Sequence, residues 1–385
     1  MKIKKNIVIM YLIGLLQGMV FYSAVSTLYR QAVGVTVFQI TIIESISLAL
    51  ALAFELPWGI LAEKIGYKRT MIICCMLYFL SKIVFWKANG FGMFLLERIM
   101  LSIVMAGLSG VDISVLYLSC EKERVHKVFS IYDSLQTAGL LIAAGIYNVF
   151  LCEDYRAAGL ATVISYGIAA VLACFLKEVK STEPKEEPPM KEFVVILKDT
   201  LKRKELLLFL VGIALFSECH QTITVFLNQL QYIRSGMSDR MIGIVYVIVT
   251  IIGLLGAKSA SFTKTLGKKK TGILLFSTAI GACLALMLTV NPILSVVAIL
   301  LLRLAYSLLV PLSQTIENQM VTHKNRATAL SIHSLIMDGV AIFTNLIYGK
   351  VSDCYLPAAF AIGMGFCIIG LLLFVYSTNK MVREG

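Results

Sequence analysis

The stretch Gly59-Ile-Leu-Ala-Glu63-Lys-Ile-Gly66-Tyr-Lys68-Arg69 occurs a second time, in a weaker form, later in the chain. The second copy reads Ala260-Ser-Phe-Thr-Lys264-Thr-Leu-Gly267-Lys-Lys269-Lys270, and its central glycine lies 201 residues after that of the first. In both copies a small residue precedes the central glycine by seven positions, and two basic residues follow it at the second and third positions. The pair Ser130-Ile131 recurs as Ser331-Ile332 at the same offset. This internal repeat predicts two parallel halves of similar structure.

The composition places both halves in a membrane. Of the 385 residues, 58% are apolar and 15% are charged, and the mean hydropathy is +0.83. Soluble proteins are roughly 45–50% apolar and about 25% charged. Because a spanning helix needs about 20 mostly apolar residues, we expect an all-α membrane protein with twelve transmembrane helices, arranged as two pseudo-symmetric six-helix bundles. The predicted spans are 6–29, 38–62, 70–88, 92–118, 128–151, 157–176, 205–233, 240–262, 271–290, 292–318, 327–349 and 355–378.

These spans divide the chain into three segments. The N-terminal bundle is expected over 1–176, a cytoplasmic linker over 177–204, and the C-terminal bundle over 205–385. The linker contains three prolines and most of the local charge. Its last part places Val194, Leu197 and Leu201 on one helical face, which predicts an amphipathic helix lying on the membrane surface.

The distribution of basic residues predicts the orientation. With the N-terminus in the cytoplasm, the inner segments hold 25 Lys and Arg residues and the outer segments hold six. Cytoplasmic loops of membrane proteins collect Lys and Arg. We therefore expect a protein of the plasma (cell inner) membrane with both termini in the cytoplasm. The net charge of +12 then needs no nucleic-acid partner. The nine cysteines form no C-x-x-C pair, which predicts buried, reduced side chains; we expect neither a metal nor a cofactor.

The first copy of the repeated stretch resembles the signature loop that follows the second helix in the major facilitator superfamily of secondary transporters. The preceding Glu55-x-Pro57-x-Gly59 and Arg98 on the fourth span are also similar to that family's residues. The resemblance covers essentially the whole chain, although the family's Gly-Pro antiporter pair is missing from the fifth span. It implies that the loop is a latch that stabilises the outward-facing state, and a plain cytoplasmic anchor is the alternative. The implied gating residues are Gly59, Glu63, Gly66, Lys68 and Arg69.

The repeat also relates polar residues on the fourth and tenth spans. Each span carries four polar positions with spacing 4, 7 and 3, which places them on one helical face. We expect both faces to point inward, because polar side chains facing lipid would cost several kcal/mol. The two sets are Arg98, Ser102, Ser109 and Asp112, and Arg303, Ser307, Gln314 and Glu317.

Two carboxylates lie near the middle of predicted spans, Glu218 on the seventh and Asp338 on the eleventh. An ionisable residue at that depth is expensive, and it is usually paired or functional. We therefore predict that both residues take up and release protons. The alternative is a permanent salt bridge to Arg303 or a hydrogen bond to a backbone group.

Other polar side chains are candidates for binding and gating. The predicted substrate-binding residues are Gln17, Tyr22, Ser26, Tyr29, Arg98, Arg303, Gln221 and His220. Packing is the alternative for the aromatic residues, and an interior hydrogen bond is the alternative for the histidine. Further gating candidates are Glu44, Asp112, Asp133 and Glu317, with helix-end capping as the alternative. Lys82 is expected to extend its amine out of the apolar region.

These features favour a secondary transporter that moves a small organic solute across the plasma membrane by alternating access. Aromatic rings and a carboxylate suit a lipophilic cation, so proton-coupled efflux of amphipathic or cationic compounds is the leading hypothesis. The alternatives are proton-coupled or facilitated uptake of a small organic nutrient, and a transporter-like receptor without turnover. No motif of an ATPase, serine hydrolase or zinc protease is present, so we do not expect an enzyme. The expected partners are the solute, protons and the lipid bilayer, and we expect a monomer.

Overall fold

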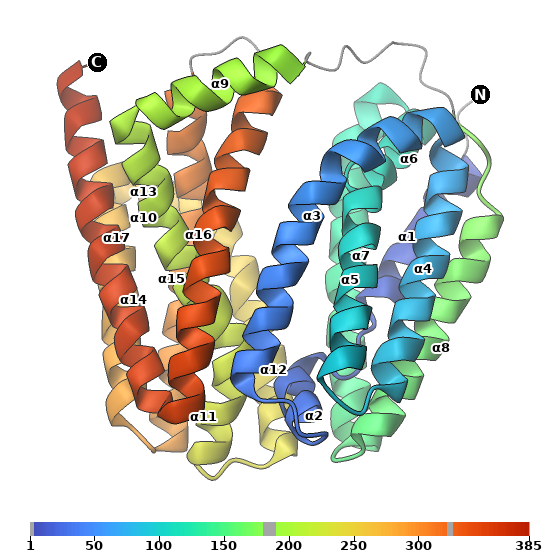
Figure 1. Cartoon of the computed structure of the whole chain (residues 1–385), viewed down its shortest axis with the longest axis horizontal. Coiled ribbons are helices and arrows are strands. Elements are labelled where there is room, and N and C mark those ends of the chain that lie inside the picture. The colour runs from blue at the N-terminus through green and yellow to red at the C-terminus, as the bar shows by residue number, and fades with distance from the viewer. Residues whose placement is uncertain (1–3, 180–189, 322–325, 385) are drawn as a thin grey trace. The chain divides into compact units, whose positions relative to one another are not determined.

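The computed structural model describes residues 4–179, 190–321 and 326–384, which form helices joined by short turns and contain no strand (Figure 1). Twelve helical segments among these residues are long and apolar enough to cross a membrane. Each corresponds in order to one predicted span, so the predicted all-α fold is confirmed. The segments are Lys4–Gln31, Val37–Phe54, Tyr67–Lys87, Phe91–Ser119, Val125–Leu151, Tyr155–Cys174, Lys204–Arg234, Asp239–Leu266, Lys268–Leu288, Pro292–Met320, Thr328–Cys354 and Leu356–Lys380.

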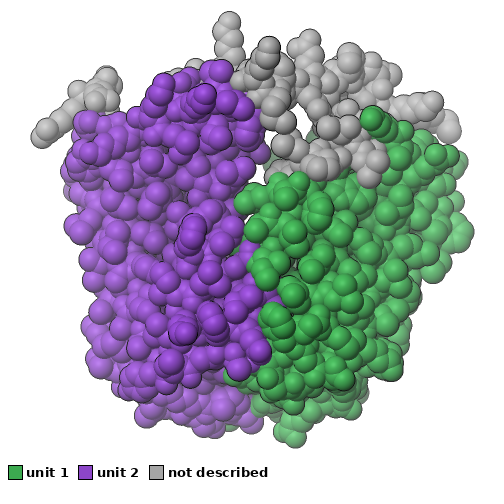
Figure 2. Space-filling model, in the orientation of Figure 1, with its two compact units in different colours: residues 1–35, 46–184, 239–247 green, residues 36–45, 185–238, 248–385 purple. Residues whose placement is uncertain are grey.

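The chain forms two compact units, and each includes a short segment from the other half of the sequence (Figure 2). Unit 1 comprises Met1–Val35, Ile46–Pro184 and Asp239–Val247. Unit 2 comprises Thr36–Ser45, Lys185–Ser238 and Ile248–Gly385. The segments 36–45 and 239–247 are related by the offset of the sequence repeat. The exchange between the halves is therefore itself pseudo-symmetric.

Unit 1 contains the first six spans, apart from the start of the second. Its elements are α1 (Lys4–Gly18), η1 (Ser23–Val25), α2 (Ser26–Gln31), most of α3 (Val37–Ile65), α4 (Tyr67–Lys87), α5 (Phe91–Leu108), α6 (Val111–Ser119), η2 (Lys122–Arg124), α7 (Val125–Ile146), η3 (Tyr147–Leu151) and α8 (Tyr155–Cys174). Helices α1 and α7 approach so closely that a side chain added at Gly18 or Gly139 would overlap backbone atoms of the other helix. In a membrane the hydrophobic effect does not drive helices together, and small residues instead allow the close van der Waals packing that holds them.

Unit 2 contains the last six spans, preceded by the helix of the linker. Its elements are α9 (Met190–Lys202), α10 (Lys204–Gln221), η4 (Thr222–Leu227), α11 (Asn228–Arg234), the end of α12 (Asp239–Gly253), η5 (Leu254–Lys258), α13 (Ser259–Leu266), α14 (Lys268–Leu288), α15 (Pro292–Met320), α16 (Arg326–Cys354) and α17 (Leu356–Glu384). The segments η3 and η4 are π-helical turns within the fifth and seventh spans. Such turns leave the regular ladder of backbone hydrogen bonds.

The first span is interrupted, although its sequence predicts one continuous helix. Helix α1 ends at Gly18, and the next helical turn begins at Ser23. Hydroxyl groups of α8 satisfy the backbone groups that the break releases: Ser165 donates to the carbonyl of Leu16 at 2.7 Å, and Thr162 accepts from the N–H of Phe21 at 3.0 Å. A broken helix in a membrane requires such partners, because an unpaired backbone group costs several kcal/mol there.

The polar face predicted for the fourth span is also interrupted. Helix α5 ends at Leu108, and Gly110, with φ +77°, separates it from α6. Ser109 and Asp112 therefore do not continue the helical face of Arg98. The tenth span, by contrast, is the single helix α15, so its four polar positions keep their predicted common face. The repeat in sequence is thus not matched by the same continuity of helix.

Lys82 is buried within unit 1, and the expectation that it reaches out of the apolar region is wrong. Its Nζ lies 3.3 Å from Glu97 Oε1, and the two side chains are 6% and 2% exposed. The amine also lies over the rings of Tyr78 and Tyr166, at 5.1 and 5.5 Å from their centroids. A nearby carboxylate and two aromatic faces replace the water that the amine would otherwise need.

Replacing Lys82 by methionine is expected to destabilise unit 1 by about 3–5 kcal/mol, because Glu97 would remain as an uncompensated buried charge. The change Lys82→Met combined with Glu97→Gln removes both charges and should recover most of the loss. Thermal unfolding of the purified protein measures both effects. A single variant as stable as the wild type would contradict a buried ion pair.

Candidate functional site

Three carboxylates gather within unit 2. Glu218 lies near the end of α10, Asp338 lies on α16, and Glu44 belongs to the part of α3 that packs in this unit. Asp338 and Glu44 are close enough to Glu218 for their negative charges to act on it. All three side chains are half-buried. The structure thus brings the two predicted proton-coupling residues together and adds Glu44, which the sequence suggested only for gating.

Glu218 has one buried oxygen, Oε2, with no hydrogen-bond partner among the described residues. A buried carboxylate oxygen without a partner costs free energy. The cluster of Glu44, Glu218 and Asp338, called here the acid cluster, adds repulsion between like charges. A proton on one member relieves this repulsion.

His220 and Arg303 meet beside the acid cluster. The ring of His220 stacks on Tyr306 with centroids 3.7 Å apart, and its Nε2 lies 3.4 Å from Arg303 Nη1 and 3.2 Å from Thr224 Oγ1. Because a guanidinium group can only donate, Nε2 acts as the acceptor and the ring is neutral. Its proton is then on Nδ1, which has no partner in the described part of the chain. Gln221 is exposed at the end of α10.

Two glycines make room for the polar face of α15. A side chain at Gly253 would overlap Arg303 Nη2, and one at Gly256 would lie 2.7 Å from the carbonyl oxygen of Ser307. Both glycines lie where α12 gives way to the 3₁₀ segment η5. The sequence shows no sign of this contact, because the glycines lie about 50 residues before the positions they serve.

The candidate residues of unit 1 lie in a different environment. Tyr22 and Tyr29 are 5% and 1% exposed; Tyr22 stacks on Phe85 with centroids 4.0 Å apart. Ser26, at the start of α2, is half-buried. Gln17 donates to Cys75 Sγ at 3.5 Å. The structure brings the two tyrosines together in an aromatic cluster inside the unit.

Arg98 lies on α5 one turn before Ser102, whose hydroxyl donates to the carbonyl of Arg98 at 2.9 Å. Ser102 is also 2.8 Å from the hydroxyl of Ser47 on α3. The short serine pair shows that α3 and α5 pack closely here.

The signature loop is held by an acid that the sequence did not indicate. Gly66 precedes α4 with φ +89°, and the carboxylate of Glu178 accepts from the N–H of Lys68 at 3.3 Å. A carboxylate at this position complements the N-terminal end of the helix dipole. Arg69 is exposed, and for Gly59 and Glu63 the structure describes only the helical backbone. Glu178 follows the sixth span, so only the fold brings it to this loop.

Substituting alanine for Gly66 is expected to cost more stability than the same change at Gly267. Both glycines adopt a backbone conformation that other residues reach only at about 1–3 kcal/mol, with φ +89° and +80°. Only Gly66 also faces a carboxylate, because an added Cβ would lie 3.1 Å from Glu178 Oε2. Thermal unfolding compares the two variants, and adding Glu178→Ala should remove the difference. Equal melting temperatures of the two single variants would contradict this crowding.

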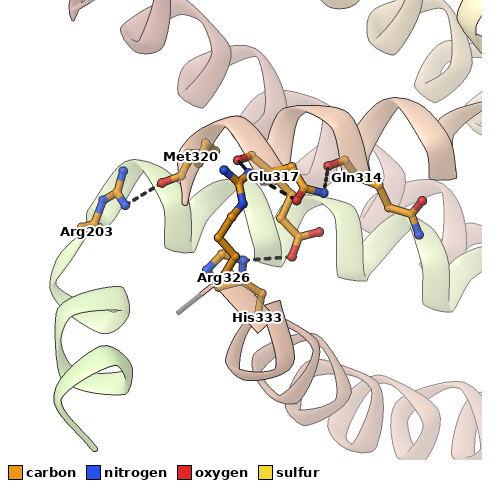
Figure 3. Close-up of polar contacts among 7 residues, drawn as sticks. Arg203, Gln314, Glu317, Met320, Arg326 and His333 are labelled. Atoms are coloured by element: carbon orange, nitrogen blue, oxygen red, sulfur yellow. Dashed lines mark hydrogen bonds and ion pairs between the residues drawn. The ribbon is translucent and has the colours of Figure 1, made fainter. Parts of the chain in front are cut away.

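One end of α15 and the start of α16 carry a second polar cluster, shown in Figure 3. His333 Nδ1 lies 2.9 Å from Glu317 Oε1, and the two side chains are 1% and 12% exposed. Arg203, which links α9 to α10, donates to the carbonyl of Met320 at 2.7 Å, which caps the end of α15. Gln314 is exposed, and only its carbonyl takes part, accepting from Asn318.

The sequence suggested Glu317 but missed its partner. Glu317 and His333 flank the short connection between the tenth and eleventh spans. Consecutive antiparallel helices bring the end of the first beside the start of the second. The position of Glu317 before the connection and of His333 after it could therefore have indicated the pair.

The exchanged segments, 36–45 in unit 2 and 239–247 in unit 1, make specific contacts. In unit 2 these lie at the end of α16 that is opposite to His333. In unit 2, Asp353 of α16 accepts from the N–H groups of Val37 and Phe38 at 2.9 and 3.0 Å, which caps α3. Gly349, one turn earlier, leaves space that Thr41 fills, since an added Cβ would overlap its hydroxyl.

Unit 1 repeats this arrangement with the roles of the residues reversed. Gly243 of α12 leaves space for Asn148, because an added Cβ would overlap the Asn148 side chain. Tyr155 donates to Asp239, at the start of α12, at 2.6 Å. By the repeat offset of 201, position 148 corresponds to 349, and position 41 corresponds to 242, the neighbour of Gly243. Each contact therefore pairs one glycine with one polar side chain.

The last two acidic candidates lie near helix ends or on the surface. Asp112 is in the first turn of α6, and its carboxylate accepts from the N–H of Ile113 at 2.7 Å. This bond satisfies one free N–H group in the first turn of α6, whose N-cap is Gly110, and the predicted gating role of Asp112 stays a prediction. Asp133 is exposed on α7. Among the described residues, no group of three or more His, Cys, Asp or Glu side chains could hold a metal ion.

The fold and sequence together define the class of protein. The sequence model described as Major Facilitator Superfamily matches residues 7–344, so the chain belongs to this family, and it is a multi-pass membrane protein. No curated protein matches the chain in sequence.

Similar solved structures include the nucleoside transporter NupG, with a TM-score of 0.82, 14% identity, and coverage of 97% of this chain and 98% of that one. A bacterial homologue of the human lysosomal transporter Spinster, inward-facing and unoccupied, has a TM-score of 0.74 and 14% identity, covering 99% and 98%. A D-xylose–proton symporter has a TM-score of 0.73 and 14% identity, covering 97% and 96%. At this identity the likeness shows the fold alone.

Proposed function

We propose that the protein is a proton-coupled exporter of amphipathic or cationic organic compounds, working by alternating access in the plasma membrane. It acts as a monomer with both termini in the cytoplasm. The observation that carries this proposal is the acid cluster, in which the half-buried carboxylates of Glu44 and Asp338 lie close enough to Glu218 for their charges to act on it within a single unit.

The acid cluster supports coupling between a proton and a cation. Three carboxylates in a partly buried site repel one another, and either a proton or a bound cation relieves the repulsion. The two ligands therefore compete for the same negative charge. Competition of this kind exchanges a cation bound from one side for a proton bound from the other, provided that the site faces only one side at a time.

In this proposal two contacts act as gates: the contact of segment 36–45 with α16, and the contact between Glu317 and His333. Asp353 and Gly349 hold the start of α3 in unit 2, and the contact between Glu317 and His333 joins α15 to α16 at the other end of the helices. The charge count of the loops places the first contact outside and the second inside. Opening one while the other closes would expose the acid cluster to each side in turn.

Uptake of a small polar nutrient is the second candidate. The stack of His220 on Tyr306 and the adjacent Arg303 offer a ring face and hydrogen-bond donors, which suit a neutral solute better than a cation. The missing Gly-Pro pair of the antiporter motif also favours this direction. In this case the acid cluster would bind the proton that accompanies the solute.

Sealed proteoliposomes with an internal pH dye test these functions. The purified protein is challenged with a panel of lipophilic cations and of sugars and nucleosides, with the compound added on one side. Exchange predicts that a cation added outside enters the liposomes while protons leave, so the interior becomes more alkaline. Symport predicts that solute and proton enter together, so the interior becomes more acidic. Binding without movement of either would overturn both and support a receptor.

A further inference from the structure

A cavity of about 320 Å³ opens at one end of unit 1, among α1, α6 and α7. Its floor is apolar, and its rim carries three cations and one acid. The floor is formed by Ile7, Tyr11, Val128 and Ile131, and the rim by Lys4, Arg124, Lys127 and Glu121. Glu121 pairs with Arg124 at 3.5 Å, so the rim keeps two net positive charges.

The cavity lies where three candidate spans begin or end. Lys4 is the first residue of the first span, Val125 is the first residue of the fifth, and Ser119 is the last residue of the fourth. The rim is therefore at the boundary between the apolar and polar parts of the helices. Lipid headgroups occupy this level of a membrane, and the loop charges assign this boundary to the cytoplasmic side.

The internal repeat shows what covers the corresponding face in unit 2. Adding 201 to Val128 and Ile131 gives Ala329 and Ile332 at the start of α16. Both are buried, at 1% and 0% exposure, in a small core with Ile196 of the linker helix α9. An amphipathic helix thus covers in unit 2 the face that stays open as a cavity in unit 1.

The linker helix is shared between two environments. Phe193 and Leu197 also pack against this core of unit 2, whereas Val194 and Leu201 remain 39% and 49% exposed. The apolar face of α9 is therefore broader than the stripe that the sequence indicated, and only part of it is covered by protein. Its predicted position on the membrane surface stays a prediction.

The two faces differ in charge. The positions that correspond to Lys4 and Lys127 are Glu205 and Thr328 in unit 2, and Glu205 is paired with Lys380. The apolar side of an amphipathic helix suits this face of unit 2, where one corresponding position is a paired acid and the other is a neutral threonine. The basic rim of unit 1 requires an occupant that is apolar at one end and anionic at the other.

We propose that the unit 1 cavity binds a phospholipid with an anionic headgroup. Its phosphate lies among Lys4, Arg124 and Lys127, and its glycerol and upper acyl carbons lie on Ile7 and Val128. The shape, the depth and the charge of the cavity each meet one property of this ligand. The site is separate from the acid cluster and does not depend on the transport function proposed above.

Lipid binding is measured by native mass spectrometry of the protein from nanodiscs that contain phosphatidylcholine alone or with phosphatidylglycerol. Each cation near an anionic lipid surface contributes about fivefold in affinity. The triple variant Lys4→Gln, Arg124→Gln, Lys127→Gln should therefore bind phosphatidylglycerol about 100-fold more weakly. Phosphatidylcholine binding should not change. The variant Val128→Trp, which fills the apolar floor, should also lose bound phosphatidylglycerol while keeping all three cations.

A triple variant with the same charge change controls for general electrostatics. Lys64, Lys198 and Lys202 are exposed and do not line the cavity, so their replacement by glutamine should leave phosphatidylglycerol binding within about twofold of the wild type. Equal losses in both triple variants would overturn the proposal, as would equal binding of the two lipids. Inorganic phosphate that stabilises the protein in detergent as strongly as phosphatidylglycerol would show a site for free phosphate. A peptide with the sequence of residues 190–202 that binds in the cavity of a protein that retains no lipid there would show a helix-binding groove.

Discussion

Replacing Glu218 by glutamine is expected to reduce substrate-driven proton movement in proteoliposomes about 100-fold, the lower end of what a positioned proton-transfer group contributes. Glutamine keeps the shape of the side chain but cannot take up the proton. The change also removes one of the three carboxylates of the acid cluster, so the protein should be at least as stable as the wild type. Binding of the driving compound, measured separately by calorimetry, should survive at reduced affinity if that compound is a cation.

Glu205 provides the matched control for this experiment. It lies on the same helix, α10, and pairs with Lys380 outside the acid cluster. Glu205→Gln should leave proton movement unchanged, whereas Asp338→Asn should reproduce the loss seen with Glu218→Gln. Proton movement that persists in both Glu218→Gln and Asp338→Asn would remove the acid cluster from the coupling mechanism.

Adding a methyl group at Gly349 is expected to weaken the contact between α3 and α16 and to shift the protein toward the state that is open on that side. The new Cβ would overlap the Thr41 hydroxyl and lie 3.0 Å from the Cα of Phe38. Overpacking of this kind costs about 1–3 kcal/mol, which corresponds to a shift of about 5- to 150-fold between two states. Ser45→Cys, at a position that is 5% exposed beneath this contact, reports the shift through its rate of reaction with a membrane-impermeant maleimide, in a protein whose exposed Cys174 and Cys354 are replaced by serine.

Two further variants separate a local clash from general damage. Gly365→Ala adds the same methyl group on α17, where no heavy atom lies within 4 Å, and should leave the labelling rate unchanged. Thr41→Ala combined with Gly349→Ala removes the overlapping hydroxyl and should restore part of the wild-type rate. A labelling rate in Gly349→Ala that equals that of the wild type would show that this contact does not close that side of the protein.

The sequence was sufficient to predict the twelve spans and the internal repeat that relates its two halves, because both depend on features that extend over many residues. The offset between Gly66 and Gly267 is visible without a structure, and so is the pair Glu218 and Asp338, since carboxylates stand out within apolar runs. Long-range partners were not predictable. Glu178 reaches the signature loop across 110 residues, and neither position carries a local signal for the other.

Local geometry accounts for the remaining differences. The break after Gly18 depends on hydroxyl groups of α8 that accept and donate at the right places, and hydropathy does not detect them. Lys82 appeared to lie close enough to a helix end to reach water, but Glu97 on the next helix offers it a closer partner. In both cases a residue distant in sequence decides the local conformation.

The exchange of short segments between the two units constrains how the chain can be made. Unit 1 includes Asp239–Val247, so the contacts of Asn148 and Tyr155 with that segment can form only after the ribosome has passed the seventh span. Thr36–Ser45 must likewise wait, after its own synthesis, for α16 to emerge near the end of translation. Neither unit completes its packing until its segment from the other half of the sequence has been synthesised, which for segment 36–45 means a wait until almost the entire polypeptide has been made.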